Sequence, residues 1–339
     1  MLENKKILFV SVSFFNYEKI IKNKLEQRGA IVDLYDERPS NSIFIKGLLR
    51  IKRDAYALQI KKYYSNILEE VKNKKYDYFL LIKGEVIPIY FIKMVKELNP
   101  GIVLIYYNFD SFYNNPNALD FLPLFDHNFT FDTEDAEKYN LNFRPLFYSD
   151  DYEKIRLEKQ ENKTNYDIAF IGTAHSDRYL ISEGVSKEAK KIGLKHFAYY
   201  YSQGRSVFLF KKLFDKSFKK FDYKKLSFNS LSHSQIIDIY KSCNYILDIN
   251  HPSQKGLTMR TFEALGAGKK LITTNTEIAK YKIFESGNVL LIDRNTVKLE
   301  PDFFKSSRVD FDDQTLYAMS IDGWIDNIFF IKAQMPKWF

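Results

Sequence analysis

The chain has 339 residues with 51 basic and 43 acidic side chains, a formal net charge of +8 at pH 7. Hydrophobic residues make up 45% and charged residues 28%, which excludes disorder as the main state, and the length suggests two domains. No run of about 18 apolar residues occurs that could span a membrane, and the single cysteine, Cys243, excludes an internal disulfide and a multi-cysteine zinc site.

The N-terminal apolar run and the excess of basic side chains are informative about cellular location and binding partners. The run within Met1–Phe15 is short and has no small-residue cleavage site, so it indicates a strand rather than a signal peptide. A lone cysteine fits a reducing cytoplasm. The pI of about 9.1 favours anionic partners, namely nucleotide phosphates, an acidic membrane surface or nucleic acid. We therefore expect a cytoplasmic protein and leave open a peripheral position on the inner face of the plasma membrane.

The first 150 residues alternate short apolar runs with amphipathic segments. The apolar runs predict buried strands at Lys6–Val12, Ala30–Tyr35, Asp77–Ile82, Ile102–Tyr107 and His127–Phe131. Between them we predict a helix with Asn16 as its N-cap and Gly29 as its stop, a helix over Ile60–Val71 with apolar residues at helical spacing, and a helix near Pro88–Leu98. Alternating strands and helices indicate βαβ units and a parallel sheet.

A polar, charged stretch interrupts this pattern, and we interpret residues 151–165 as a linker between a first domain, 1–150, and a second, 166–312. The second domain repeats the alternation, with strands predicted at Asp167–Ile171, Lys195–Tyr200, Tyr245–Ile249, Lys270–Thr274 and Val289–Ile292. Helices are predicted near Asp177–Lys191, Ser234–Lys241 and Leu257–Leu265. Residues 313–339 form a C-terminal helix, over about Asp313–Ile331, and a tail. An α/β protein with two Rossmann-like domains and a cleft between them is the simplest architecture.

The segment from Asn250 to Asn275 is the most informative part of the sequence. It runs from the end of a strand through a glycine loop into a helix, and ligands of open α/β sheets bind outside the carboxyl ends of strands. The N-terminus of that helix suits a diphosphate. Arg260 and Glu263 share one helix face, so a cation there can hold phosphate while the carboxylate accepts hydrogen bonds from ribose hydroxyls. The alternative is an ordinary amphipathic helix with an Arg–Glu surface pair.

The run RTFEALGAGKKLITTN, from Arg260 to Asn275, resembles the nucleotide-sugar-binding segment of bacterial group-1-type glycosyltransferases. The similarity is greatest to the branch of spore-maturation and polysaccharide-biosynthesis transferases, which reads R-x-F-E-x-x-A-x-G-x-x-L-[IL]-T. Upstream, YDIAFIGTAHSDR looks like the first strand and glycine turn of that family's C-terminal domain. The N-terminal segments DYFLLIKGE, NFDSFYNNPN and LPLFDHNFTFDTEDAEKY resemble the same branch.

The resemblance implies the GT-B fold, with an N-terminal acceptor domain, a C-terminal donor domain, and a C-terminal helix for which we leave open a return to the N-domain. It implies no cofactor and no essential metal, because the helix dipole and basic side chains would stabilise the leaving diphosphate. The residues expected to bind the donor nucleotide are Gly172, Thr173, His251, Lys255, Gly256, Thr258, Arg260 and Glu263. Many retaining relatives carry a glutamate where this chain has Lys255, so inversion of configuration is favoured and Lys255 has an alternative place beside the diphosphate.

Two further strand ends supply candidates for the acceptor side. Asp110 and Ser111 follow one predicted strand, and Asp110 is the first candidate for the general base that deprotonates an acceptor hydroxyl. Lys83 and Glu85 end the neighbouring strand; Glu85 is the second candidate base, and Lys83, like Ser111, is expected to bind acceptor or phosphate. The alternative for Asp110 is a helix cap or a turn residue.

The stretch from Arg205 to Phe228 mixes lysines with phenylalanines. It is interpreted either as a solvated basic face with core-facing aromatics or as a surface for an anionic membrane. Nucleic acid is a third reading that no base-stacking motif supports, so no nucleic-acid partner is expected.

The expected function is transfer of a sugar from a nucleotide sugar to a hydroxyl of a growing surface glycan, such as capsule or lipopolysaccharide, on a glycan or lipid-linked acceptor. A non-catalytic nucleotide-sugar or glycan-binding subunit of a polysaccharide assembly is the alternative. A sugar-nucleotide epimerase of the same fold fits the Arg260–Ala264 segment less well.

Overall fold

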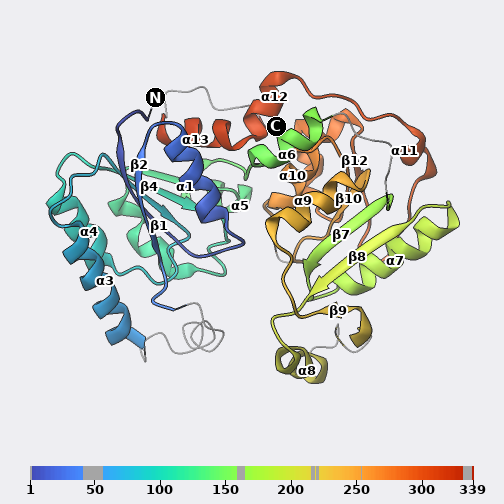
Figure 1. Ribbon diagram of the computed structural model, residues 1–339, viewed down its shortest axis with the longest axis horizontal. Helices are drawn as coiled ribbons and strands as arrows, with labels where there is room; N and C mark the ends of the chain where they lie inside the picture. Colours follow the sequence, from blue (N-terminus) through green and yellow to red (C-terminus); the bar gives the residue numbers. More distant parts are fainter. Residues whose placement is uncertain are drawn as a thin grey trace. The chain divides into compact units, whose positions relative to one another are not determined.

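The computed structural model describes residues 2–40, 56–158, 165–214, 218, 221–252, 254–330 and 338–339. Contacts divide the chain into two compact units. Unit 1 combines Met1–Pro145 with Ile321–Met335, and unit 2 combines Leu146–Ser320 with Pro336–Phe339. Each unit has its own sheet and its own flanking helices (Figure 1).

Unit 1 is built on a six-stranded parallel sheet in the order β2-β1-β3-β4-β5-β6. The strands are β1 (Lys6–Ser11), β2 (Ile31–Asp36), β3 (Tyr78–Ile82), β4 (Val103–Asn108), β5 (His127–Thr130) and β6 (Asn142–Phe143). Their apolar runs are buried because helices cover the sheet, as is usual for parallel strands. The order places β1 beside β3, so β2 lies on one side of this pair and β4, β5 and β6 lie on the other.

The helices of unit 1 follow the predicted alternation. They are α1 (Tyr17–Gln27), α3 (Ala57–Val71), α4 (Ile89–Leu98), the 3-10 helix η2 (Pro116–Leu124) and α5 (Thr133–Tyr139). In α3 the apolar side chains at helical spacing are buried, as expected. Asn16 does occupy the N-cap position of α1, but the prediction that its side chain caps the helix is wrong. Its backbone is left-handed, with φ of 64°, and its side chain makes no capping hydrogen bond.

The C-terminal helix α13 (Ile321–Phe329) returns to unit 1, where it lies beside α1 (Figure 1). Trp324 is fully buried and packs edge-to-face on Tyr107 of β4, with ring centroids 4.9 Å apart. Phe329 packs on Tyr78 of β3, and Arg28 forms an ion pair with Asp326. This helix therefore contributes to the core of a unit whose other elements all precede residue 146.

Unit 2 repeats the architecture with the strand order β12-β11-β10-β7-β8-β9, and all pairs are parallel. The strands are β7 (Ile168–Thr173), β8 (His196–Tyr201), β9 (Leu226–Ser227), β10 (Tyr245–Asp248), β11 (Lys270–Thr273) and β12 (Val289–Leu291). The α-helices are α6 (Asp150–Leu157), α7 (Arg178–Lys191), α8 (Arg205–Phe214), α9 (His233–Lys241), α10 (Met259–Gly266), α11 (Pro301–Lys305) and α12 (Asp313–Met319). The 3-10 helices are η4 (Tyr223–Lys225), η5 (Thr276–Lys280) and η6 (Lys282–Ser286).

Two predicted segments have different boundaries in the structure. The stretch 151–165 was expected to be a linker, yet it begins inside α6, whose side chains Tyr152 and Ile155 are buried. The helix expected over 313–331 is divided into α12 and α13 at Ser320, where the backbone is extended (φ −80°, ψ 163°). The break leaves the carbonyl of Met319 able to accept a 2.9 Å hydrogen bond from the backbone N–H of Tyr148. In the part of the chain that the structure describes, no helix has the length and apolarity of a membrane span.

Candidate functional site

The predicted donor residues gather at one edge of the sheet of unit 2. The chain continues from β7 to β8 on one side and from β10 to β11 on the other, so the loops after β7 and β10 diverge at a topological switch point, where open α/β sheets bind ligands. The loop after β7 carries His175 and the loop after β10 carries His251, and their rings lie 5.5 Å apart. Arg178 joins the same two segments by donating from Nε to the carbonyl of Ile249 at 2.8 Å.

Hydrogen bonds to its backbone carbonyl groups hold the loop between β10 and α10. The side-chain amide of Asn275 donates to the carbonyls of Lys255 at 3.1 Å and Gly256 at 3.3 Å. Gly256 is buried, whereas the Lys255 side chain is exposed. The structure thus fixes the path of the loop, with the exposed Lys255 side chain at the carboxyl edge of the sheet.

The first turn of α10 is fastened to β10 by a carboxylate that sequence reasoning missed. Asp248, the last residue of β10, accepts hydrogen bonds from the hydroxyls of Thr258 at 2.7 Å and Thr261 at 2.9 Å. Burial raises the pKa of Asp248 above its ordinary value. Thr258 is the N-cap residue of α10, but its hydroxyl serves Asp248 and makes no capping hydrogen bond to the helix. The helix N-terminus is therefore positioned by Asp248.

Arg260 and Glu263 lie together, as their spacing predicts, and a tyrosine from another helix joins them. Nη1 of Arg260 donates to the hydroxyl of Tyr240 at 3.2 Å and lies 3.7 Å from Oε2 of Glu263. The Tyr240 hydroxyl donates to Oε2 of Glu263 at 3.4 Å. Tyr240 is buried and Glu263 is only 2% exposed, so this is an internal arrangement and not the Arg–Glu surface pair of the alternative reading. Tyr240 lies on α9, and the sequence offered no signal for its role.

A second arginine, Arg294, connects three segments near the carboxyl ends of β7, β10 and β11. Its guanidinium binds both carboxylate oxygens of Asp177 at 3.0 and 3.1 Å. It also donates to the side-chain oxygen of Asn250 at 2.7 Å and to the hydroxyl of Thr274 at 3.0 Å. Sequence reasoning did not single out Arg294. Its contacts brace the loops around the predicted donor residues.

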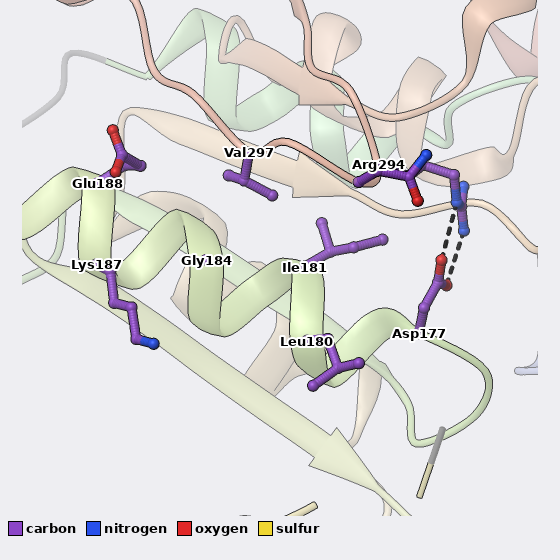
Figure 2. A pocket seen from close by; sticks show the side chains of 9 residues that line it. Asp177, Leu180, Ile181, Gly184, Lys187, Glu188, Arg294 and Val297 are labelled. Carbon is purple, nitrogen blue, oxygen red and sulfur yellow. Dashed lines mark hydrogen bonds and ion pairs between the residues drawn. The ribbon is translucent and has the colours of Figure 1, made fainter. Parts of the chain in front are cut away.

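A pocket of about 420 Å³ lies between α7 and the segment around Arg294 (Figure 2). Figure 2 shows the Asp177–Arg294 pair at one end of α7 and Lys187 and Glu188 further along the same helix. Leu180, Ile181 and Val297 supply its apolar lining. None of the predicted donor residues lines this pocket.

The predicted acceptor-side residues form a charged cluster at the carboxyl edge of the sheet of unit 1. Nζ of Lys83 lies 3.2 Å from Oδ2 of Asp110 and 3.5 Å from Oε2 of Glu85. Arg38, which follows β2 and was not predicted, forms an ion pair with the same oxygen of Glu85. The backbone N–H of Ser111 donates to Oδ1 of Asp110 at 2.9 Å. The structure therefore brings all four predicted residues together and pairs both candidate bases with cations.

The loop after β3, which carries Lys83 and Glu85, is held in an uncommon conformation. Lys83 and Gly84 both have positive φ, at 79° and 71°, and a side chain at Gly84 would start 2.2 Å from the ring of Phe121. The amide of Asn115 donates to the carbonyls of Lys83 at 2.9 Å and Gly84 at 3.1 Å. Glycine is required at position 84 because its φ is positive and because a side chain there would clash with Phe121.

A buried carboxylate supports the other end of this loop. Oε1 of Glu37 accepts hydrogen bonds from the backbone N–H groups of Val86 and of Ile87, the latter at 3.1 Å. Glu37 is fully buried, and this burial raises its pKa from 4.5 to about 7. Among the described residues, its Oε2 has no hydrogen-bond partner. Sequence reasoning missed Glu37, which directly follows the end of β2.

The basic aromatic stretch 205–228 is described in part, because residues 215–217 and 219–220 lie outside the described residues. Phe208, Phe218 and Phe221 are buried in the core of unit 2, as the core-facing reading expects. Leu209 and Leu213 of α8 are exposed on its other side. Phe210 of α8 is also exposed, at 64%, so the segment has core-facing aromatics together with an exposed apolar side that includes an aromatic ring.

Comparison with solved structures identifies the fold. An α-glucosyltransferase in complex with UDP and DNA superposes with a TM-score of 0.55 at 14% identity, over 94% of this chain and 93% of that one. The lipopolysaccharide outer core galactosyltransferase WaaB has a TM-score of 0.52 at 12% identity, over 96% and 99% of the two chains. HepE from Anabaena, in complex with UDP and glucose, has a TM-score of 0.52 at 12% identity, over 96% and 95%.

These likenesses extend over both units. The two Rossmann-like units have the GT-B fold that the sequence predicts. No protein-family model matches the chain, and no curated protein sequence matches it.

Proposed function

We propose that this protein is a glycosyltransferase that moves a sugar from a nucleotide diphosphate sugar to a hydroxyl of a growing surface glycan. The observation that carries the proposal is the position of the charged residues, at the carboxyl edge of both sheets of a GT-B fold. Solved proteins of the same fold include an α-glucosyltransferase in complex with UDP or UDP-glucose, and HepE in complex with UDP and glucose. Capsule and lipopolysaccharide are the glycans that the sequence resemblance favours.

The donor is proposed to bind at the switch point of unit 2. The N-terminus of α10 would face the diphosphate with its N–H groups and positive dipole end, and the exposed Lys255 would add a cation. Gly172 and Thr173 end the adjacent strand β7 and allow close approach of a phosphate. Glu263 would accept hydrogen bonds from ribose hydroxyls, which requires its 2% exposed side chain to open toward the ligand. Arg260 would lie beside it on the diphosphate side.

This assignment is tested by Glu263→Ala, which should weaken binding of UDP, GDP or whichever nucleoside diphosphate the wild type prefers. We expect a loss of about 1.5–3 kcal/mol, the usual size for a hydrogen bond to a charged group. Isothermal titration calorimetry on the folded variant measures this loss, and Glu263→Gln separates the effect of charge from that of shape.

Arg260→Ala should weaken binding of a nucleoside diphosphate more than binding of the nucleoside alone.

Exposed Glu300, on the same unit, gives the control variant Glu300→Ala, which should bind as the wild type does. Unchanged nucleotide affinity in Glu263→Ala would remove Glu263 from the donor site. Equal losses of nucleoside and nucleotide in Arg260→Ala would rule out its phosphate role.

A second prediction concerns metal. We expect sugar transfer to survive chelation by EDTA, because α10, Arg260 and Lys255 would take the charge of the leaving diphosphate that a divalent cation carries elsewhere. The measurement is the rate of nucleotide release with and without EDTA, and with Mg²⁺ or Mn²⁺ restored. Complete loss of activity that metal reverses would contradict this scheme.

On the acceptor side, Asp110 is proposed as the general base of an inverting displacement, with Glu85 as the second candidate. The base takes the hydroxyl proton while the new glycosidic bond forms and the bond to the diphosphate breaks. Lys83 pairs with both carboxylates. The carboxylate of Asp110 has further lone pairs with which it would accept a hydrogen bond from an acceptor hydroxyl. Lys83 and Ser111 then remain as ligands for acceptor hydroxyls or phosphate.

A lipid-linked acceptor would bring the protein to an anionic membrane on the cytoplasmic side. The exposed Leu209 and Leu213 and the lysines around them support this peripheral role. Nucleic acid is not proposed as a partner; the DNA in some structural neighbours belongs to those proteins.

A non-catalytic nucleotide-sugar-binding subunit is the second candidate, favoured by the lysine at position 255. Slow release of free nucleoside diphosphate from the donor supports the enzyme, whereas tight donor binding without any turnover supports the binding subunit.

A further inference from the structure

Exposed aromatic side chains border the charged cluster of unit 1. Phe14 and Phe15, in the loop after β1, are 44% and 58% exposed. Phe14 stacks on Phe109, which follows β4, with ring centroids 5.6 Å apart and an interplanar angle of 28°. It also stacks more distantly on Tyr17 of α1, with centroids 6.4 Å apart. Phe15 meets Phe14 edge-on at 4.7 Å. We call Phe14, Phe15 and Phe109 the aromatic shelf.

The loop after β1 is built so that its two phenylalanines face solvent. Phe15 and Asn16 both adopt left-handed backbone conformations, with φ of 50° and 64°, which non-glycine residues seldom adopt. The buried carboxylate of Glu18 fixes the loop by accepting hydrogen bonds from the backbone N–H of Phe14 at 3.1 Å and from the hydroxyl of Ser13 at 3.3 Å. Exposed phenylalanines held by an uncommon backbone need a reason, because the same rings would be more stable in the core.

The aromatic shelf is continuous with the proposed acceptor site. Strand β3 lies between β1 and β4 in the sheet, and its loop carries Lys83 and Glu85. The contact between Phe14 and Phe109 therefore bridges the strand whose loop bears these charges. Phe109 also directly precedes Asp110, the proposed base.

We propose that the aromatic shelf binds a pyranose ring of the acceptor, which makes the acceptor a carbohydrate at the residue that receives the new sugar or next to it. A pyranose has an apolar face of C–H groups and a rim of hydroxyls. Flat rings such as Phe14 take the C–H face, while carboxylates and ammonium groups beside them take the hydroxyls. A lipid chain would gain nothing from the four charged side chains of the adjoining cluster, which would lose hydration beside it.

This inference rests on the proposed function, and its test uses the methyl glycosides of glucose, galactose and N-acetylglucosamine as probes. Saturation-transfer NMR should show contact with the C–H groups of at least one of them on the wild-type protein. Phe14→Leu, which keeps an apolar side chain but removes the ring, should weaken that binding by about 3- to 10-fold. Phe14→Tyr keeps the ring and should bind within about twofold of the wild type. Leu58→Ala, a change at an 80% exposed apolar residue of the same unit, should have no effect.

Two results would overturn the inference: no saturation transfer to any of the three glycosides, or equal binding by wild type and Phe14→Leu. Octanoate below its micelle concentration provides the lipid comparison. If octanoate binds at the aromatic shelf with the same affinity in wild type and Phe14→Leu and displaces the glycoside, the surface is apolar and serves a lipid. Titration with UDP, GDP, dTDP and CMP on the same protein separates this question from the proposed function. Donor binding without glycoside binding refutes only the aromatic shelf, and glycoside binding without donor binding refutes only the proposed transferase.

Discussion

Replacing Asp110 by asparagine is expected to lower the turnover of sugar transfer by about 10²–10⁴-fold, the usual cost of losing a general base. An amide cannot accept the hydroxyl proton in the transition state, although it keeps an oxygen for the hydrogen bonds from Ser111 N–H and from the side chain of Asn114. Donor affinity should change little, since the residues proposed to bind the donor belong to unit 2 and Asp110 to unit 1. Initial rates at saturating donor, together with calorimetric donor affinity, measure both quantities.

The matched control is Asp120→Asn, the same chemical change at an exposed position of the same unit. Glu85→Gln completes the set. If Asp110→Asn keeps full turnover while Glu85→Gln loses it, Glu85 is the base. Full activity in both variants, or a product with the anomeric configuration of the donor, would refute an inverting reaction with a base from unit 1.

Replacing Glu37 by glutamine is expected to remove the decline in stability that the Glu37 carboxyl itself contributes between about pH 4.5 and pH 7. Burial raises the pKa of Glu37 from 4.5 to about 7, so the folded protein holds a proton that the unfolded chain releases over this interval. The contribution is therefore fully present below pH 4.5 and is lost as pH rises to 7. At about 1.4 kcal/mol per pH unit, the loss is about 3 kcal/mol.

Glutamine resembles the protonated glutamic acid, because its carbonyl oxygen can still accept from the N–H groups of Val86 and Ile87. At pH 8 the free energy of unfolding of Glu37→Gln should exceed that of the wild type by up to about 3 kcal/mol, with near equality at pH 4.5. Urea denaturation at both pH values measures the difference. Exposed Glu97 provides the control Glu97→Gln. If the difference in free energy of unfolding between Glu37→Gln and the wild type is the same at both pH values, Glu37 does not titrate in this range.

The fold was predictable because its central strands are buried on both faces. Runs such as YFLLI and IVLIYY are continuously apolar, as is typical of strands in a covered parallel sheet. Helix α6 was missed because only Tyr152 and Ile155 of it are buried, and such a pair carries little signal in a charged sequence. The division between α12 and α13 depends on the contact of Tyr148 with Met319 and Ser320, more than 170 residues away, which no local pattern can report.

In the candidate site as well, contacts within one helix were predictable from the sequence, whereas contacts between distant segments were not. Arg260 and Glu263 are three residues apart on one helix, so their proximity follows from helical geometry. Their partner Tyr240 comes from α9, and no sequence spacing relates it to them. In unit 1, Arg38 meets Glu85 because β2 and β3 lie on either side of β1 in the sheet. The ends of predicted strands therefore identify candidate site residues. Which charged residues pair with one another there depends on the order of the strands in the sheet, which the sequence pattern does not give.

The return of α13 to unit 1 determines when that unit can become complete during translation. The side chains of Trp324 and Phe329 that cover Tyr107 and Tyr78 are synthesised only after about 175 residues of unit 2. At about 5–20 residues per second, the nascent first sheet waits roughly 10–35 s with this apolar surface uncovered. Unit 2 residues emerge from the ribosome during that interval, so a chaperone that shields the surface would act on unit 1 first and be released when α13 docks.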